Sequence, residues 1–285
     1  MKIAISRTGV SATNLNVETV SQGELGANNR PVAFILPGGP GISHQVYLPY
    51  SCLRTVTDLV FHDPRGCGQS DKGELASYTM DNYIDDVEDI RRHFGLGKII
   101  LIGKSYGSMC ALGYALRYPN AMERLVLASG APSFRFLETA KLNLKRRGTS
   151  EQIKICKKLW AGSFKNLDEL LTFLQLTQPL YSVKARTSPV KADLLKRRDE
   201  FSYEVLNEGF KSQFWYFDYE HDLHKVLCPT LILAGRQDWI NDVKYAEYMS
   251  ARIPHSQMMI FDEASHAMET DVTKEYFQRI ADFIG

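Results

Sequence analysis

The chain has 285 residues, of which 44% are hydrophobic and 24% are charged, and its formal net charge is +1. These proportions are typical of a folded globular protein and exclude a disordered chain, while the near-neutral charge argues against nucleic acid as a main partner. Apolar runs are too short for a signal peptide or a membrane span, and the five cysteines are few and widely spaced, so we expect a reduced, soluble protein of the cytoplasm with no membrane partner.

The first half of the chain alternates between apolar strands and loops or helices. Residues 1–30 are polar, and residues 17–20 are expected to form one strand of a peripheral antiparallel hairpin. Buried strands are predicted at residues 31–36, 58–62, 98–102 and 124–128, and helices at residues 81–95 and 109–118. Strand, loop and helix in repetition are typical of a parallel sheet with right-handed crossovers, so the predicted fold class is α/β.

The pattern changes between residues 132 and 225, where β-branched runs are few and aromatic and charged residues are many. The segment carries 17 Lys and Arg against 12 Asp and Glu, and the spacing of its apolar residues favours helices. We therefore expect a helical cap at residues 132–225, inserted into a core made of residues 1–131 and 226–285. The second part of the core has predicted strands at residues 229–234 and 257–261 and predicted helices at residues 241–252 and 271–284.

A nucleophile pattern lies between the strand at residues 98–102 and the helix that follows it. In Gly103-Lys104-Ser105-Tyr106-Gly107-Ser108, a glycine stands two positions before and two positions after Ser105. This G-x-S-x-G arrangement holds a serine hydroxyl exposed on a sharp strand-to-helix turn, where a Cβ at either glycine would clash with neighbouring elements. Because the pattern is common by chance, the rest of the chain must supply a base, an acid and an oxyanion hole.

A serine hydroxyl needs a base to take its proton, and that base needs a carboxylate to fix its tautomer. In an open α/β sheet such residues follow the carboxyl ends of strands. Ser105, Asp238 and His266 all meet this condition, and their order along the chain is the order found on this fold. We therefore predict Ser105 as nucleophile, His266 as base and Asp238 as the acid that orients His266.

Other residues compete for these roles. Asp242 is the alternative acid, whereas Asp63 is expected to form a structural pair in the turn Asp63-Pro64-Arg65-Gly66. His44 could touch substrate, although an exposed structural histidine fits its position better.

The oxyanion hole is predicted from two backbone N–H groups. One belongs to Tyr106, directly after the nucleophile, and the other to Gly39 in the stiff loop Pro37-Gly38-Gly39-Pro40-Gly41. Such a donor contributes roughly 3–4 kcal/mol to transition-state stabilisation.

Four segments make the chain similar to the α/β-hydrolases, and within them to the proline iminopeptidase (prolyl aminopeptidase) group. They are Gly38–Gly41, Asp63–Ser70, Gly103–Ser108 and Gly235–Asp238, and they span most of the core in the right order. The resemblance implies an α/β-hydrolase fold with a cap at residues 132–225. It also implies cleavage of an N-terminal residue, often proline, from a peptide, with no metal or cofactor.

Three positions depart from that group. Pro37 stands where the group usually has histidine, Lys104 replaces a small residue before the serine, and Trp239 stands where an acid can follow the catalytic aspartate. Aminopeptidase members need carboxylates to hold the ammonium group of the substrate. Glu204 and Glu208 lie four apart on a predicted helix and share a face, so they are candidate substrate-binding residues together with Trp239, although solvated helix charges also explain the two acids.

The leading hypothesis is a serine hydrolase of the proline iminopeptidase type that acts on small peptides. The same residues could instead serve a carboxylesterase, a lactonase or a carbon–carbon bond hydrolase with a small acyl substrate. A ligand-binding homologue without catalysis is the alternative of a different class.

Overall fold

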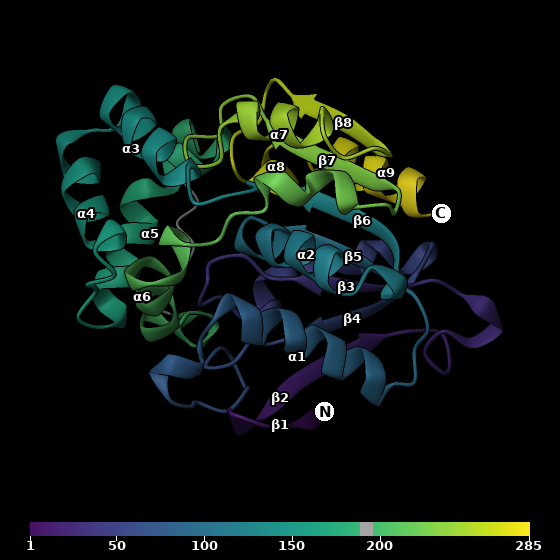
Figure 1. Cartoon of the computed structure of the whole chain (residues 1–285). Coiled ribbons are helices and arrows are strands. Elements are labelled where there is room, and N and C mark those ends of the chain that lie inside the picture. The colour runs from purple at the N-terminus through teal and green to yellow at the C-terminus, as the bar shows by residue number, and fades with distance from the viewer. Residues whose placement is uncertain (189–195) are drawn as a thin grey trace.

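A computed structural model describes residues 1–188 and 196–285, and the strands in these ranges form one eight-stranded sheet (Figure 1). The strand order is β1-β2-β4-β3-β5-β6-β7-β8. The first two pairs, β1 with β2 and β2 with β4, are antiparallel, and all the others are parallel. The predicted α/β-hydrolase architecture with a mostly parallel sheet is confirmed. The strands are β1 (Lys2–Arg7), β2 (Val10–Val20), β3 (Val32–Leu36), β4 (Asp58–His62), β5 (Ile99–Lys104), β6 (Met122–Ala128), β7 (Thr230–Gly235) and β8 (Ser256–Phe261).

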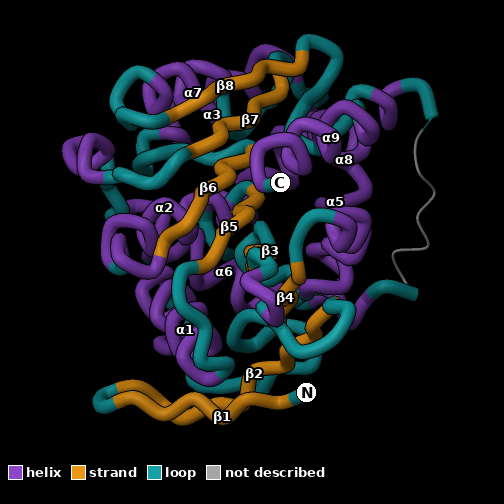
Figure 2. Tube along the Cα trace, turned by 90° about the vertical axis from the view of Figure 1, so that its right-hand side faces the viewer, coloured by secondary structure: helices purple, strands orange, loops and turns teal. Residues whose placement is uncertain are grey.

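The central strands are apolar along their whole length because both faces of the sheet are covered. Successive side chains of a strand point to opposite faces, and in β3 Phe34 and Leu36 join one hydrophobic cluster while Ala33 and Ile35 join another. The first cluster includes residues of α1 (Met80–His93), α2 (Tyr106–Arg117) and α7 (Val243–Ser250), and the second includes residues of the 3-10 helix η2 (His44–Thr55), α8 (Met268–Asp271) and α9 (Thr273–Ile284). Figure 2 shows α1, α2 and α7 on one side of the strands and α8 and α9 on the other.

Between β6 and β7 the chain leaves the sheet and forms further helices. They are α3 (Phe136–Arg147), α4 (Ser150–Trp160), α5 (Leu167–Tyr181) and α6 (Tyr203–Lys211). In Figure 1 these helices lie together beyond one end of the strands, on the left. Their positions all fall within residues 132–225, the segment that we predict to be a cap.

Short 3-10 helices complete the described secondary structure. They are η1 (Ala27–Asn29), η3 (Leu75–Ser77), η4 (Pro119–Ala121), η5 (Lys184–Arg186), η6 (Arg198–Glu200), η7 (Gln213–Trp215) and η8 (Glu220–Lys225). The predicted helix over residues 271–284 is α9, which begins two residues later. The structure adds elements to the sequence prediction: a hairpin that includes all of β1 and β2, the 3-10 helix η2, and the short helix α8 before α9.

Candidate active site

Ser105 occupies a tight turn between β5 and α2, as the sequence predicts. Its φ of 55° and ψ of −117° are unfavourable for a residue with a side chain, and strain of this kind is concentrated at functional sites. A Cβ at Gly103 would lie 2.4 Å from the carbonyl oxygen of Gly107, and a Cβ at Gly107 would lie 2.1 Å from the carbonyl oxygen of Leu36. Both glycines are therefore required for the turn to form against β3.

Asp238 and His266 are joined by a hydrogen bond. Nδ1 of His266 lies 2.8 Å from Oδ2 of Asp238, and an ionised carboxylate can only accept, so Nδ1 carries the proton. The other carboxylate oxygen accepts the backbone N–H groups of Ile240 (2.9 Å) and Asn241 (3.0 Å). Asp238 is thus held at both oxygens, and this tautomer leaves Nε2 of His266 free to accept a proton.

Ser105 and His266 line the same cavity, which has a volume of about 390 Å³. Within the described part of the chain Ser105 Oγ makes no hydrogen bond, and catalytic serine–histidine contacts often tighten only when substrate is bound. The wall of the cavity is largely apolar, and much of it comes from α4, α5 and α6. Its apolar side chains from these helices are Leu159, Leu170, Phe173, Leu174, Tyr181, Leu206 and Phe210.

The two residues predicted to form the oxyanion hole are both near the nucleophile: Tyr106 follows it directly, and Gly39 lines the same cavity as Ser105. Gly39 lines the cavity with a φ of +113°, and a Cβ on its neighbour Gly38 would lie 3.1 Å from Cβ of Ser105, so this loop packs directly on the turn. The N–H of Gly38 is already donated to the Tyr47 hydroxyl (2.8 Å). The N–H of Tyr106 belongs to the first turn of α2, where backbone donors have no partner within their own helix.

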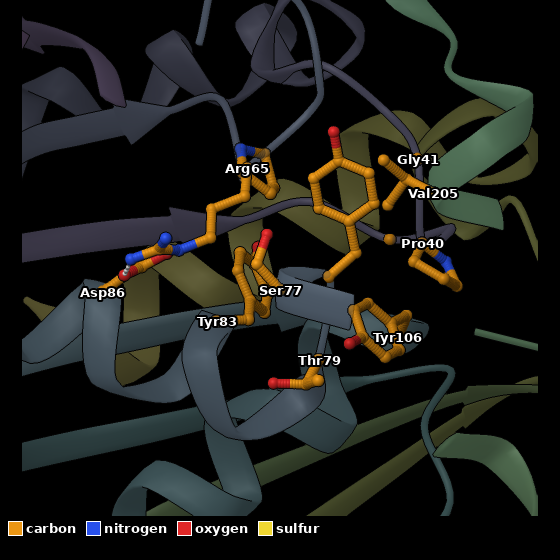
Figure 3. A pocket seen from close by; sticks show the side chains of 12 residues that line it. Pro40, Gly41, Arg65, Ser77, Thr79, Tyr83, Asp86, Tyr106 and Val205 are labelled. Carbon is orange, nitrogen blue, oxygen red and sulfur yellow. Dashed lines mark hydrogen bonds and ion pairs between the residues drawn. The ribbon is translucent and has the colours of Figure 1, made fainter. Parts of the chain in front are cut away.

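A second, small cavity of about 20 Å³ lies behind the glycine-rich loop (Figure 3). Arg65 reaches Asp86 with two hydrogen bonds of 2.7 and 2.8 Å, while Tyr106 and Pro40 border the other side of the cavity in this view. Its size fits one water molecule. This cavity therefore supports the loop and does not offer a second substrate site.

Asp63 organises the segment that follows the glycine-rich loop. Its Oδ1 accepts hydrogen bonds from Ser43 Oγ (2.7 Å), His44 N (2.9 Å) and His44 Nδ1 (2.8 Å), and its Oδ2 accepts one from Gln69 N (2.9 Å). Burial raises the pKa of Asp63, but these hydrogen bonds outweigh burial and hold the pKa well below its usual value. His44 is consequently 2% exposed, whereas the sequence suggested an exposed histidine, and Arg65 pairs with Asp86 rather than with Asp63.

The candidate acids Glu204 and Glu208 do not reach the Ser105 cavity. Helix α6 buries Val205, Leu206 and Phe210, so the two carboxylates point elsewhere. Glu204 lines a separate surface pocket, and Glu208 pairs with Lys211 at 3.3 Å.

Trp239 is fully buried and lies outside the described wall of the Ser105 cavity. Its ring packs edge-on against Tyr181, with centroids 5.4 Å apart, and Tyr181 packs in the same way against His266 at 5.3 Å. Trp239 therefore contacts a residue that contacts His266.

The alternative acid Asp242 caps α7 by accepting the Lys244 N–H at 3.1 Å.

Three charged residues of the cavity, Lys104, Arg197 and Glu269, were not among the predicted site residues, and Arg197 pairs with Glu200 at 2.6 Å. Glu269 supplies the carboxylate on the described part of the wall, and its partner is Lys104, whose Nζ lies 3.5 Å from Glu269 Oε2. The signals in the sequence were the unusual lysine before the serine and an acid three positions after His266.

In residues 1–188 and 196–285, no group of three or more His, Cys, Asp or Glu residues could hold a metal ion. Over the same ranges, no helix is long and apolar enough to cross a membrane.

Comparisons with known proteins place these features in context. Residues 31–268 match the family described as alpha/beta hydrolase fold. A proline iminopeptidase of Saccharolobus solfataricus is 30% identical over 87% of this chain and 83% of its own length, and the proline iminopeptidase PfmaB of Pestalotiopsis fici is 27% identical over 86% and 89%.

Two solved structures share the fold at low sequence identity. An esterase from Exiguobacterium antarcticum has a TM-score of 0.77 at 19% identity and covers 100% of this chain and 99% of its own. A proline iminopeptidase of Mycobacterium smegmatis has a TM-score of 0.75, also at 19% identity, with coverage of 100% and 97%.

Proposed function

We propose a function from the premise that the chain belongs to the α/β-hydrolase family, as its match over residues 31–268 and its 30% identity to a proline iminopeptidase establish. The chain is a hydrolase, and we infer that it is a serine aminopeptidase that releases the N-terminal residue of small peptides. The observation that carries this inference is the hydrogen bond between His266 and Asp238 beside a cavity that His266 and Ser105 share.

In the proposed reaction Ser105 is the nucleophile. Its Oγ forms a bond to the carbonyl carbon of the substrate, and its proton passes to Nε2 of His266. Asp238 stabilises the imidazolium through the 2.8 Å hydrogen bond to Nδ1. His266 then gives the proton to the leaving amine, and a water molecule, activated by the same imidazole, releases the aminoacyl group from Ser105.

The negative charge that develops on the carbonyl oxygen needs preorganised donors. The N–H groups of Gly39 and Tyr106 are the proposed pair. A turn that is rigid before substrate arrives costs no reorganisation during the reaction, and the close packing of Gly103 and Gly107 supports such rigidity.

The proposed substrate enters between the sheet and residues 132–225, which act as a cap. Helices α4, α5 and α6 contribute apolar side chains to the cavity wall, so they contact the side chain of the released residue. Glu269, the carboxylate on the described wall, faces the substrate ammonium in this proposal. Glu204 and Glu208, which lie elsewhere, have no part in it.

A small acyl ester is the second candidate substrate. The observations in its favour are the largely apolar wall and its charges: the cations Lys104 and Arg197 outnumber Glu269, the carboxylate on the described wall, so the wall has no net negative charge to attract an ammonium group. Lactones and carbon–carbon bonds in small diketones would use the same residues.

The nucleophile is tested by Ser105→Ala. We expect turnover to fall by about a million-fold, to the limit of detection, and labelling by a fluorophosphonate probe to disappear, with an unchanged circular dichroism spectrum. Ser163→Ala, at an exposed serine of the same chain, is the matched control. Undiminished turnover in the Ser105 variant would reject the mechanism, and a folded wild-type protein that the probe does not label would favour a ligand-binding homologue.

The substrate class is tested with paired chromogenic substrates, aminoacyl arylamides with a free amine and acyl esters without one. We expect Glu269→Gln to raise KM for the aminoacyl substrates by about 10- to 100-fold, the worth of a charge-assisted hydrogen bond. KM for the acyl esters should not change, since glutamine keeps an acceptor oxygen for Lys104. Wild-type activity on acyl esters alone would replace the aminopeptidase with the second candidate.

A further inference from the structure

Lys104 is an unusual residue at its position. It is the last residue of β5, directly before Ser105, and is only 3% exposed. A buried ammonium is costly unless it is paired and hydrogen-bonded. Both partners of Lys104 lie just after β8: Nζ donates to the backbone carbonyl of His266 and lies 3.5 Å from Oε2 of Glu269.

The backbone carbonyl of His266 accepts a second hydrogen bond, from Ser129 Oγ at 3.1 Å. Ser129 follows β6, so the ends of two adjacent parallel strands, β5 and β6, hold the same carbonyl. The ring of His266 is held by Asp238, which follows the next strand, β7. Backbone and ring are therefore fixed by three consecutive strands of the sheet.

We propose that Lys104 is a positioning residue, which ties the segment that carries His266 to the strand that carries Ser105. This inference rests on the proposed roles of those two residues. A proton moves between Oγ and Nε2 only when the two atoms come within hydrogen-bonding distance. Lys104 restrains the backbone that carries the imidazole, from the position directly before the nucleophile.

Glu269 completes the arrangement. Its carboxylate balances the ammonium charge inside an apolar wall and keeps Nζ directed toward the carbonyl of His266. The charged and titratable groups near His266 are then Asp238, Lys104 and Glu269, with the Tyr181 ring packed against the imidazole.

The test compares Lys104→Met with Lys98→Met. Lys98 is exposed and lies just before the opposite end of β5, so its variant loses the same charge away from the site. Methionine keeps most of the lysine volume but cannot donate. We expect Lys104→Met to lower the rate of fluorophosphonate labelling by about 10- to 100-fold, the effect of a misplaced reacting group. With p-nitrophenyl acetate, the loss should fall on kcat rather than on KM.

Ser129→Ala removes the other donor to the same carbonyl and is the second variant if Lys104→Met folds poorly. We expect a loss of the same kind, smaller because one donor remains. A lysine that only stabilises the fold would lower Tm without slowing the labelling of the folded protein, so labelling of both variants at the wild-type rate overturns the proposal.

A measurement that does not depend on catalytic activity can test the positioning role of Lys104 separately from the proposed function. The proton on Nδ1 of His266 gives a downfield resonance in proton NMR, assigned by its absence in His266→Gln. We expect the resonance to shift or broaden in Lys104→Met and to stay unchanged in Lys98→Met. If the wild-type protein is not labelled, the proposed function fails, and an unchanged resonance in Lys104→Met would then reject the positioning role on its own.

Discussion

Two buried histidines beside Asp63 differ in the partners of their rings. His62 ends β4, neither of its ring nitrogens has a hydrogen-bond partner in the described residues, and burial lowers its pKa to about 4. Burial also lowers the pKa of His44, but hydrogen bonds to Asp63 and Glu18 outweigh burial and raise this pKa above its ordinary value. The partners, rather than the depth of burial, decide the charge state.

His62 should make the folded protein sensitive to acid. Between pH 6.5 and about pH 4 the unfolded chain binds a proton at His62 and the folded chain does not, so stability is lost as the pH falls through this range. His62→Phe removes this loss because phenylalanine binds no proton. We expect the free energy of unfolding in urea to decrease less from pH 7 to pH 5 in the variant than in the wild type, and equal decreases would contradict the lowered pKa.

At the scale of single residues, the sequence could indicate which residues were candidates for the site, but not the direction in which their side chains point. Ser105, Asp238 and His266 could be proposed as site residues because each follows a strand, and the structure joins Asp238 and His266 by a hydrogen bond. The spacing of Glu204 and Glu208 correctly indicated a shared helix face, but which face meets the cavity depends on how α6 packs, and that packing buries Val205, Leu206 and Phe210. Glu269 could not be chosen over other acids without knowledge of the contact that Lys104 makes across the sheet.

At the scale of elements, α2 packs so closely on β3 that the structure has no room for one additional methyl group between them. Adding such a group should therefore destabilise the fold. A Cβ at Gly107 would meet the backbone oxygens of Leu36 at 2.1 Å and Pro37 at 2.6 Å, neither of which can move aside as a side chain can. We expect Gly107→Ala to lower the free energy of unfolding by about 3 kcal/mol or more. Gly97→Ala, at an exposed glycine with no atom within 4 Å of its Cβ, is the matched control and should change it little, as urea titrations would show. A similar effect of both substitutions would show that the close approach is not the cause.

The strands were predictable because buried parallel strands consist of apolar runs with clear ends, and the bounds of β4 agree with the sequence prediction. The short helix α8, which precedes the predicted last helix, was not predictable from periodicity. The buried Asp271, at the end of α8, accepts hydrogen bonds from Ser182 Oγ (2.6 Å) and Val183 N (3.0 Å), which are distant in sequence, and from Ser265 N (2.9 Å), six positions earlier. Hydrogen bonds between residues far apart in the chain leave no periodic pattern in the local sequence.

At the scale of the whole molecule, the repetition of strands and helices predicted the sheet, but it did not predict the path of residues 132–225 relative to that sheet. Residues 132–225 separate β6 from β7, yet these strands are neighbours in the sheet. Because the two strands are parallel, residues 132–225 leave from the carboxyl end of β6, beside the site, and return to the amino end of β7, at the opposite end of the strands. The helices that line the cavity therefore belong to the outgoing part of a path that later crosses back along the sheet. Which side chains they present there depends on helix packing, and the sequence alone does not specify it.

The proposed nucleophile and base lie far apart along the chain, and this separation matters while the chain is being synthesised. The proposed nucleophile stands at residue 105 and the proposed base at residue 266, beyond the last strand, so a chain released early from the ribosome has the serine without its histidine. Such a fragment also lacks β8, the strand that pairs with β7. In the proposed mechanism, a fragment that ends before His266 therefore lacks hydrolytic activity, although it carries Ser105.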